Sequence, residues 1–317
     1  MNKISTVGMS REEWLSIRRK TIGGSDAAGI IGLSQWSTPY TVWADKTGRL
    51  PDKEDSEAMR QGRDLEQYVA ERWMEATGKK VRRVNAILYH EAYPFAHADI
   101  DRAVVGENAI LECKTTSTLD LKVFKSGEFP ERYYTQCVHY LAVTGAQRIY
   151  LAVLVFGKGF YHYVLERDAD EIKALMDAER NFFESYVKTD TPPGLDGQEP
   201  TTDALTTVYA DGGTGGEVEL FGRETLLDRR EELKKTAAEI NLQIAEIENT
   251  IKADMQDAER GYCGRYDVRW ARRNGRKTFS VQSLAHDYPD IDISQYYEVG
   301  NPSRAFSVKV IKNKEDN

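Results

Sequence analysis

The sequence predicts an α/β fold in which a mixed central sheet is flanked by helices, followed by a long helix and a small β-rich module. Three observations predict it. The run AILECK at 109–114 is apolar on both faces, as is typical of a central strand. Helical and strand patterns follow one another in the order α-β-β-α-β-β from residue 56 onward. Apolar residues then recur every seven positions, which marks one long helix over 223–257.

Composition restricts the class of protein. The 317 residues are 40% apolar and 30% charged, enough for one large domain with a smaller appendage. There is no run of 18 apolar residues and no signal-peptide core, so we expect a cytoplasmic protein with no membrane partner. The cysteines, Cys113, Cys137 and Cys263, are odd in number and lack C-x-x-C spacing, which argues against a disulfide framework or a zinc site.

A first helix capped by Ser10 is expected to end in the basic triplet Arg18-Arg19-Lys20. The segment TIGGSDAAGIIG at 21–32 follows, with Ser25 or Asp26 as the cap of a second, short helix. A glycine-rich approach to a helix start, beside a serine and arginines, can bind an anion. The alternative is an ordinary capped helix start.

Two further helices are expected to support the sheet. One runs from about 56 to 77, with Glu66 at the margin of its apolar stripe, where it could reach a site or be a surface acid. The other runs from about 130 to 145 and places Gln136 and His139 on one side.

Residues 97–115 are predicted to form the hairpin that carries the chemistry, with strands at 97–102 and 109–115 and a turn at 106–108. Because side chains alternate along a strand, Glu112 and Lys114 share one face. The hairpin could bring Asp101, or Asp99 on the same face, beside them.

Converging carboxylates can bind a hard divalent cation such as Mg²⁺. A neighbouring lysine can orient or deprotonate a water, or stabilise an oxyanion, and metal-assisted phosphodiester hydrolysis requires this combination. The alternative is an ordinary strand whose Glu112 and Lys114 face solvent. Burial on both faces favours the functional interpretation, because buried charges are costly unless they are paired or bound to a metal.

The C-terminal third has a different organisation, with a linker rich in proline and glycine ahead of the long helix. Its apolar stripe must pack on the core, another subunit or a partner. The net charge of −8 counts mildly against nucleic-acid binding, yet residues 260–277 hold seven basic residues against one acid, interleaved with aromatics. This segment either contacts DNA or a partner, or is a solvated face. Its candidate contacts are Arg269, Arg272, Arg273 and Arg276.

Together, these pieces resemble the YqaJ-like viral recombinase family, a lambda-exonuclease-like group of the PD-(D/E)xK nuclease superfamily. The resemblance covers roughly residues 10–190. Its motifs are GGSDAAGIIG at 23–32 with Trp14 and Arg18 upstream, GRDLE at 62–66, DIDR at 99–102 with ECK at 112–114, and YTQCVHYL at 134–141.

The resemblance implies a PD-(D/E)xK core and a role for each matching residue. Lys114 would orient the attacking water and stabilise the transition state, and Gln136 would position that water or Lys114. The implied metal ligands are Asp101, Glu112, the backbone carbonyl of Cys113 and, as an outer or second-metal ligand, Glu66. The expected domains are a nuclease core at 1–190, a linker at 191–221, a heptad-patterned helix at 222–258 and a basic β-rich module at 259–317.

The DNA contacts also follow from the resemblance. Ser25 and Arg18 match positions that hold a 5′ phosphate, with Arg19 beside them. The family's usual P-D-G is I-D-R here. This departure makes Asp99 the less favoured ligand and would let Arg102 touch the substrate.

The implied activity is Mg²⁺-dependent 5′-to-3′ digestion of double-stranded DNA ends, with Mn²⁺ as an alternative cofactor. The product would be 3′ single-stranded tails for an annealing protein, in the cytoplasm of a bacterial host, from a phage or prophage protein. Kinship also implies a homotrimer. The alternatives are a nuclease of the same core that cuts internally or with other polarity, and a DNA-binding or docking protein that does not cut.

Overall fold

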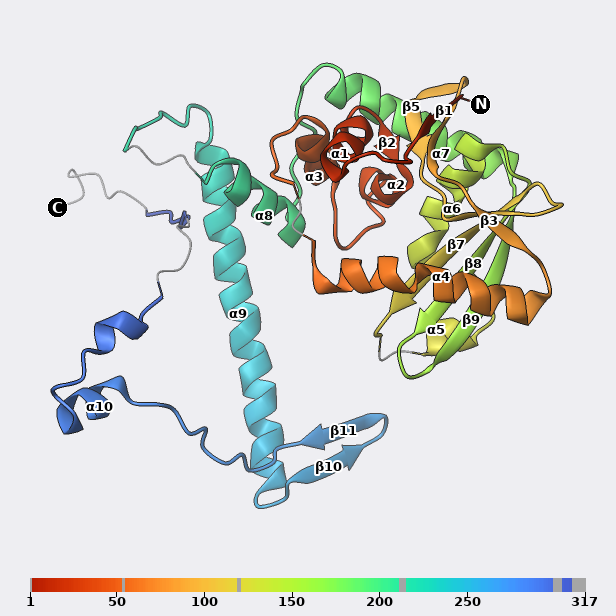
Figure 1. Cartoon of the computed structure of the whole chain (residues 1–317). Coiled ribbons are helices and arrows are strands. Elements are labelled where there is room, and N and C mark those ends of the chain that lie inside the picture. The colour runs from red at the N-terminus through yellow and green to blue at the C-terminus, as the bar shows by residue number, and fades with distance from the viewer. Residues whose placement is uncertain (1, 53–54, 119–120, 211–214, 299–303, 310–317) are drawn as a thin grey trace. The chain divides into compact units, whose positions relative to one another are not determined.

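The computed structural model describes residues 2–52, 55–118, 121–210, 215–298 and 304–309. The chain divides into two compact units, 1–212 with 303–317 and 213–302. The predicted mixed α/β class is confirmed in the first unit (Figure 1). Its elements are β1 (Asn2–Ser5), α1 (Arg11–Arg19), β2 (Ile22–Gly23), α2 (Gly24–Ile30), α3 (Pro39–Lys46), α4 (Glu57–Thr77), β3 (Val81–Arg83), β4 (Ala86–His90), β5 (Tyr93–Ala98), β6 (Arg102–Val104), β7 (Ala109–Thr116), α5 (Lys122–Lys125), α6 (Glu131–Thr144), β8 (Arg148–Val155), β9 (Gly159–Glu166), α7 (Ala169–Phe182), the π-helical turn η1 (Phe183–Val187) and α8 (Glu199–Val208).

The larger sheet has the strand order β3-β6-β7-β8-β9. Its β7 and β8 strands are parallel, and its other neighbouring pairs are antiparallel. The strand that contains AILECK therefore lies at the centre, as its two-sided apolar pattern predicts.

Alternation along β7 divides the core into two faces. Leu111 packs with Trp73 of α4 and Tyr150 of β8 on one face. Ile110 belongs to the cluster formed with α2, α6 and α7 on the other. Because Glu112 and Lys114 have the same parity as Ile110, they point toward the side of α6.

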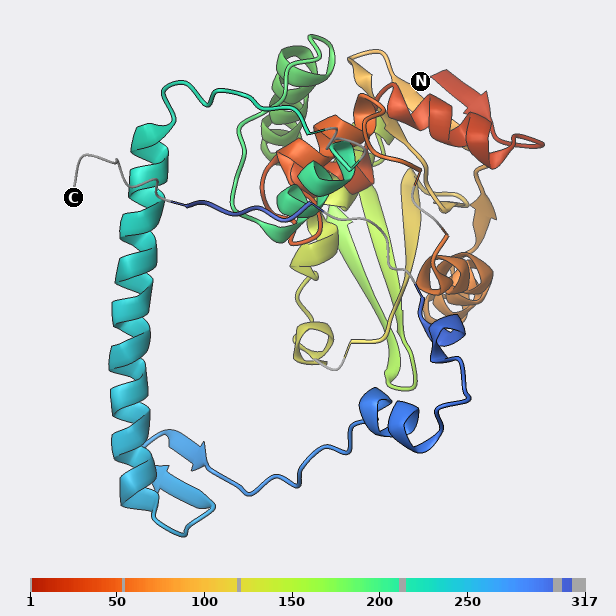
Figure 2. The same cartoon turned by 90° about the vertical axis from the view of Figure 1, so that its left-hand side faces the viewer.

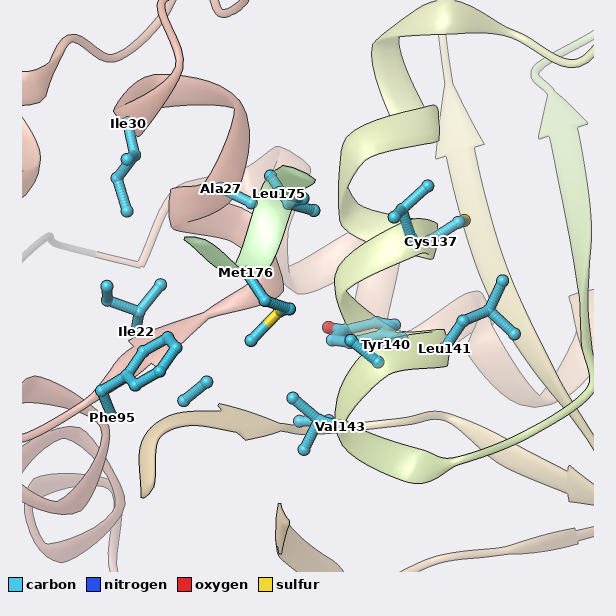
Figure 3. Packing of buried hydrophobic residues seen from close by; sticks show 14 of the residues in the cluster. Ile22, Ala27, Ile30, Phe95, Cys137, Tyr140, Leu141, Val143, Leu175 and Met176 are labelled. Atoms are coloured by element: carbon cyan, nitrogen blue, oxygen red, sulfur yellow. The ribbon is translucent and has the colours of Figure 1, made fainter. Parts of the chain in front are cut away.

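A smaller sheet with the order β1-β4-β5-β2 brings the N-terminal segment beside the site. In it, β2 pairs in parallel with β5, so that Gly23 lies opposite His97. Figure 3 shows part of the apolar cluster of this unit, where side chains from α2, α6 and α7 lie with Ile22 of β2 and Phe95 of β5.

The hairpin differs from its predicted bounds. The expected strand over 97–102 is divided between the end of β5 at Ala98 and the start of β6 at Arg102. Residues 99–101 lie between the strands, because β5 pairs with β4 and β2 whereas β6 pairs with β3 and β7. The chain therefore passes from the smaller sheet to the larger one at the segment that contains Asp99 and Asp101.

Two local expectations are also corrected. The cap of α2 is Gly23, neither Ser25 nor Asp26, and the Asp26 carboxylate accepts the Gly23 N–H at 2.8 Å. The expected linker at 191–221 contains α8, which packs on α3 through a buried Thr38–Thr201 hydroxyl contact of 2.7 Å. A proline- and threonine-rich composition concealed this helix.

The second unit contains α9 (Glu224–Met255), β10 (Arg260–Cys263), β11 (Tyr266–Arg269), α10 (Val281–Asp287) and the 3₁₀ turn η2 (Ile293–Tyr296). The predicted long helix is observed as α9, which is continuous in Figure 2. The predicted β-rich module is corrected to one hairpin, β10–β11, followed by helical turns, and residues 304–309 are not in a strand. Among the described residues, no helix combines the length and apolar character needed to cross a bilayer.

Candidate metal and phosphate site

Glu112 is a buried carboxylate at the centre of the sheet, with an exposed fraction of 3%. Its Oε1 receives hydrogen bonds from Lys114 Nζ at 2.6 Å and from Gln136 Nε2 at 2.9 Å. Its Oε2 is buried and has no hydrogen-bond partner among the described residues. Burial raises the pKa of Glu112, and Lys114 and Gln136 oppose that shift.

Lys114 is held as a cation. Burial alone would lower its pKa, but the carboxylates of Glu112 and Asp101 outweigh burial and raise it. The structure therefore favours the expected role of orienting a water or stabilising negative charge over that of a proton-accepting base, because an ammonium group has no acceptor.

Asp101 faces the same cluster from the segment between β5 and β6. Its Oδ2 accepts the backbone N–H of Cys113 at 2.7 Å. Burial and the nearby Glu112 charge raise the pKa of Asp101 well above its ordinary value. The hairpin thus brings Asp101, Glu112 and Lys114 together, as the sequence predicted.

The residues present fit a hard divalent cation. Two carboxylates that repel each other and one buried oxygen without a partner would all be stabilised by positive charge. In the part of the chain that the structure describes, no three His, Cys, Asp or Glu side chains converge as a ready metal cluster. A cation here would therefore rest on Asp101, Glu112 and the expected carbonyl of Cys113, with water for the remainder.

Helix α6 connects this cluster to α2. Gln136 Nε2, which binds Glu112, also lies 2.9 Å from the hydroxyl of Tyr140. A Cβ atom at Gly24 would lie 2.6 Å from Cε1 of Tyr140 and 3.1 Å from Cγ of Gln136. Only glycine at position 24 lets α2 approach α6 this closely, so the start of α2 lies against the helix that holds Gln136.

Arg18 and Ser25 meet at the start of α2, as the resemblance implied. Arg18 Nη2 donates to Ser25 Oγ at 3.2 Å, and its Nε lies 3.1 Å from Asp99 Oδ2. The guanidinium stacks over Trp14, 4.2 Å from the ring centroid. Asp99 is therefore ion-paired with Arg18, although its buried Oδ2 receives no hydrogen bond from the described residues, and its rank as a metal ligand stays a prediction.

His97 contacts the Arg18 guanidinium, and the sequence did not predict this contact. Its Nε2 accepts from Arg18 Nε at 3.4 Å, so Nδ1 carries the proton toward Thr21 Oγ1 at 2.8 Å. Burial, followed by the charges of Arg18, Lys46 and His139, lowers the pKa of His97 to about 2. The ring therefore stays neutral.

Arg102 does not reach the substrate side, and this expectation is corrected. Its exposed fraction is 2%, and it forms an ion pair with Glu66 and donates to Gln67 at 3.1 Å. It also donates to the Asp101 carbonyl at 2.7 Å. A buried guanidinium needs such partners, and here it fixes both Asp101 and Glu66, which leaves Glu66 as an outer member of the site.

Arg19 points away from Ser25 and pairs with Asp52, with Asp45 at 3.9 Å. The other predicted arginines, Arg269, Arg272, Arg273 and Arg276, lie exposed in the second unit, on β11 and the segment after it. Arg269 lies 3.8 Å from Asp267. Contact of these arginines with DNA or a partner remains a prediction.

A buried ion pair supports α6 from the opposite side. His139 Nδ1 lies 2.8 Å from Oε1 of Glu179 on α7, and its Nε2 lies 2.8 Å from the His97 carbonyl. Both ring nitrogens face acceptors, which identifies an imidazolium. Glu179 follows the inward positions Ile172 and Met176 of α7, and this spacing was the signal in the sequence that could have found it.

Comparisons with known proteins agree with the motifs. A family model described as the YqaJ-like viral recombinase domain matches residues 13–147. The uncharacterized protein YqaJ of Bacillus subtilis (strain 168) is 40% identical over 287 residues, which are 89% of this chain and 90% of that protein.

Two solved structures share a more distant likeness. An alkaline exonuclease from Laribacter hongkongensis is 21% identical with a TM-score of 0.48, over 56% of this chain and 93% of that one. A phage-related exonuclease from Haemophilus somnus 129PT is 12% identical with a TM-score of 0.42, over 56% of this chain and all of that one.

Proposed function

The chain belongs to the YqaJ-like viral recombinase family, and from that premise we propose that it is a metal-dependent deoxyribonuclease that digests double-stranded DNA from 5′ ends. The observation that carries the proposal is Glu112. A carboxylate is buried on a central strand, with one oxygen fixed by Lys114 and Gln136 and the other without a partner among the residues that the structure describes, and this arrangement suits a cation.

Mg²⁺, with Mn²⁺ as the alternative, would polarise the scissile phosphate and supply an activated water when bound. The protein groups have separate tasks. Lys114 places a fixed positive charge beside Glu112, where it can neutralise charge that develops on the phosphate. Gln136 holds the Glu112 carboxylate in one orientation, and Cys113 N–H does the same for Asp101.

We assign the preference for 5′ ends to Arg18 and Ser25. Arg18 Nη1 makes no hydrogen bond to the described residues, whereas Nε and Nη2 are engaged by Asp99, His97 and Ser25. The Arg18 guanidinium is fixed at two of its nitrogens and has N–H groups left at the third. Such a group suits a terminal phosphate, which binds through charge-assisted hydrogen bonds. The close approach of Gly24 to Tyr140 and Gln136, which binds Glu112, supports a short path between this phosphate group and the carboxylates.

Membership of the family supports a role in recombination. Resection from 5′ ends would leave 3′ tails for a single-strand annealing protein in the host cytoplasm. A homotrimer that encloses DNA is the assembly that kinship favours. The exposed arginines from Arg269 to Arg276 would contact DNA or that partner.

A duplex labelled separately at each strand end tests the proposal, with Mg²⁺ in one reaction and EDTA in the other. Mg²⁺-dependent release from 5′ ends with intact 3′ tails is the expected result. Internal cuts or release from 3′ ends would assign the same core to another nuclease activity. No cleavage with Mg²⁺ or with Mn²⁺ in its place would favour a protein that binds DNA and does not cut it.

A further inference from the structure

Helix α9 presents an apolar stripe that its own unit leaves uncovered. It is 32 residues long, about 48 Å, and none of its described side chains is buried. Two columns alternate at spacings of four and three residues, the pattern of a coiled-coil seam. They are Leu226, Leu233, Ile240 and Ile247 in one column and Ala237, Ile244 and Ile251 in the other. The leucines and isoleucines of both columns are 38–60% exposed.

Each column also contains one charge. Arg230, which forms an ion pair with the neighbouring Glu231, precedes Ala237 in the second column, and Asp254 follows Ile247 in the first. A charge inside a seam is costly unless an opposite charge meets it, so it selects the partner's direction and register. Two parallel copies of α9 in register would set Arg230 against Arg230 and Asp254 against Asp254.

An antiparallel pair removes this conflict. When Ile240 of one copy lies level with Ile244 of the other, Arg230 of each lies level with Asp254 of the other. The remaining layers then match Ala237 with Ile247 and Leu233 with Ile251. One register therefore sets opposite seam charges together and keeps every other layer between 230 and 254 apolar, with Leu226 beyond the paired segment.

The positions that flank the seam agree with the same register. Lys234 of each copy comes beside Glu248 of the other, twice by symmetry, and Asn241 comes beside Asn241. A parallel pair would instead place Arg229 beside Lys234. Opposite charges at flanking positions of a coiled coil set the orientation of the helices.

We propose that α9 is a self-association helix that pairs with α9 of a second copy in an antiparallel coiled coil. The inference is independent of the nuclease proposal, because it uses only the second unit. Its occupant is another copy of this chain because both the seam charges and the flanking charges complement themselves on reversal.

A charge exchange in the full-length protein tests the pairing. Sedimentation velocity at low salt measures self-association of the wild type, Lys234→Glu, Glu248→Lys and the double variant, with helix content followed by circular dichroism. Each single variant sets like charges together twice, and we expect self-association to weaken about tenfold. The double variant restores opposite charges and should return close to the wild type.

Recovery in the double variant supports the antiparallel pair even if the first unit also assembles, because the readout is the difference between single and double variants. A double variant as weak as the singles would overturn the proposal and indicate that the same chain or a different protein covers α9. A wild type that does not self-associate would also overturn it.

Cross-linking provides a measurement that does not depend on charge. In a Cys263→Ser background, a short bis-maleimide should join two copies of Asn241→Cys. Asn249→Cys is the matched control, because position 249 lies on the side of the helix opposite the seam. Equal cross-linking at both positions, or none at position 241, contradicts the proposed register.

Discussion

Lys114 Nζ lies 2.6 Å from Oε1 of Glu112, two residues away on the same face of β7. Gln136 approaches the same oxygen at 2.9 Å, so Oε1 is held from two sides while Oε2 has no described partner. One carboxylate is thus divided into an anchored oxygen and an available one. This division makes the contributions of Glu112, Lys114 and Gln136 separable by mutation.

Glu112→Gln should lower the cleavage rate at least about a hundredfold, because it keeps the shape of the side chain and removes the negative charge that a cation needs. Mg²⁺ titration by calorimetry should show weakened binding, while the thermal melt should stay cooperative. Glu131→Gln, on the exposed first turn of α6, is the matched control and should cleave as the wild type does. Undiminished cleavage by Glu112→Gln would show that Glu112 is not a metal ligand.

Lys114→Arg should retain more activity than Lys114→Met if position 114 acts through its charge. The raised pKa of Lys114 keeps the wild-type side chain charged through the alkaline assay range, so no loss of rate should arise from its deprotonation up to about pH 10. Single-turnover rates across pH for the three proteins measure both effects. Equal loss in the arginine and methionine variants would instead indicate a proton-accepting or purely geometric role.

Gly24→Ala should disturb the site from the side of α2. The added Cβ would lie 2.6 Å from Tyr140 Cε1, and the resulting shift would move Gln136 away from Glu112. We expect a loss of about 1–3 kcal/mol in the free energy of unfolding, with a reduced cleavage rate. Gly62→Ala is the control, because its Cβ would meet only Thr115 Oγ1 at 3.7 Å and should be neutral or stabilising.

Ser25→Ala should reduce discrimination between 5′-phosphorylated and 5′-hydroxyl ends by about tenfold, because a charge-assisted hydrogen bond and the fixed position of Arg18 are both lost. The ratio of kcat/KM for phosphorylated and hydroxyl ends measures this discrimination. Ser16→Ala, on the exposed side of α1, should leave that ratio unchanged. If the wild type cuts both ends alike, Arg18 and Ser25 do not form a terminal-phosphate site.

The His139–Glu179 pair predicts a pH-dependent contribution to stability. Burial alone would lower the pKa of His139, but the Glu179 carboxylate and the His97 carbonyl outweigh burial and raise it. Because the raised pKa belongs to the folded state, the stabilisation is fully present below the unfolded pKa of about 6.5. It is lost as the pH rises through the folded value.

Glu179→Gln should flatten this pH dependence and cost about 3 kcal/mol at pH 6, since it leaves a buried cation unpaired. Urea unfolding from pH 6 to 9 provides the measurement. His162→Gln, an exposed histidine on β9, should leave the profile unchanged. A wild-type profile without slope above pH 6.5 would show that His139 is neutral in the folded protein.

Local patterns predicted much of this fold. The alternation in 109–114 placed Glu112 and Lys114 on one face of a central strand, and capping residues marked α1, α4 and the end of α6. The meeting of Asp101 with Glu112 could be inferred because only a short hairpin separates them. Such features depend on neighbours in sequence.

Long-range pairing could not be inferred in the same way. Arg102 lies in a motif that suggested substrate contact, yet it is buried in an ion pair with Glu66 on α4. His139 on α6 pairs with Glu179 on α7, and His97 on β5 meets Arg18 on α1. Each is a polar group whose burial depends on a distant partner, and a local pattern cannot specify which partner that is.

The N–H group of Cys113 has a consequence for how the site moves. It binds Asp101, and Glu112 and Lys114 are the residues on either side of it. One segment of β7 therefore fixes the positions of Asp101, Glu112 and Lys114. Motion of this segment would therefore shift all three groups together. We expect loss of cleavage on heating to follow the loss of the central strand.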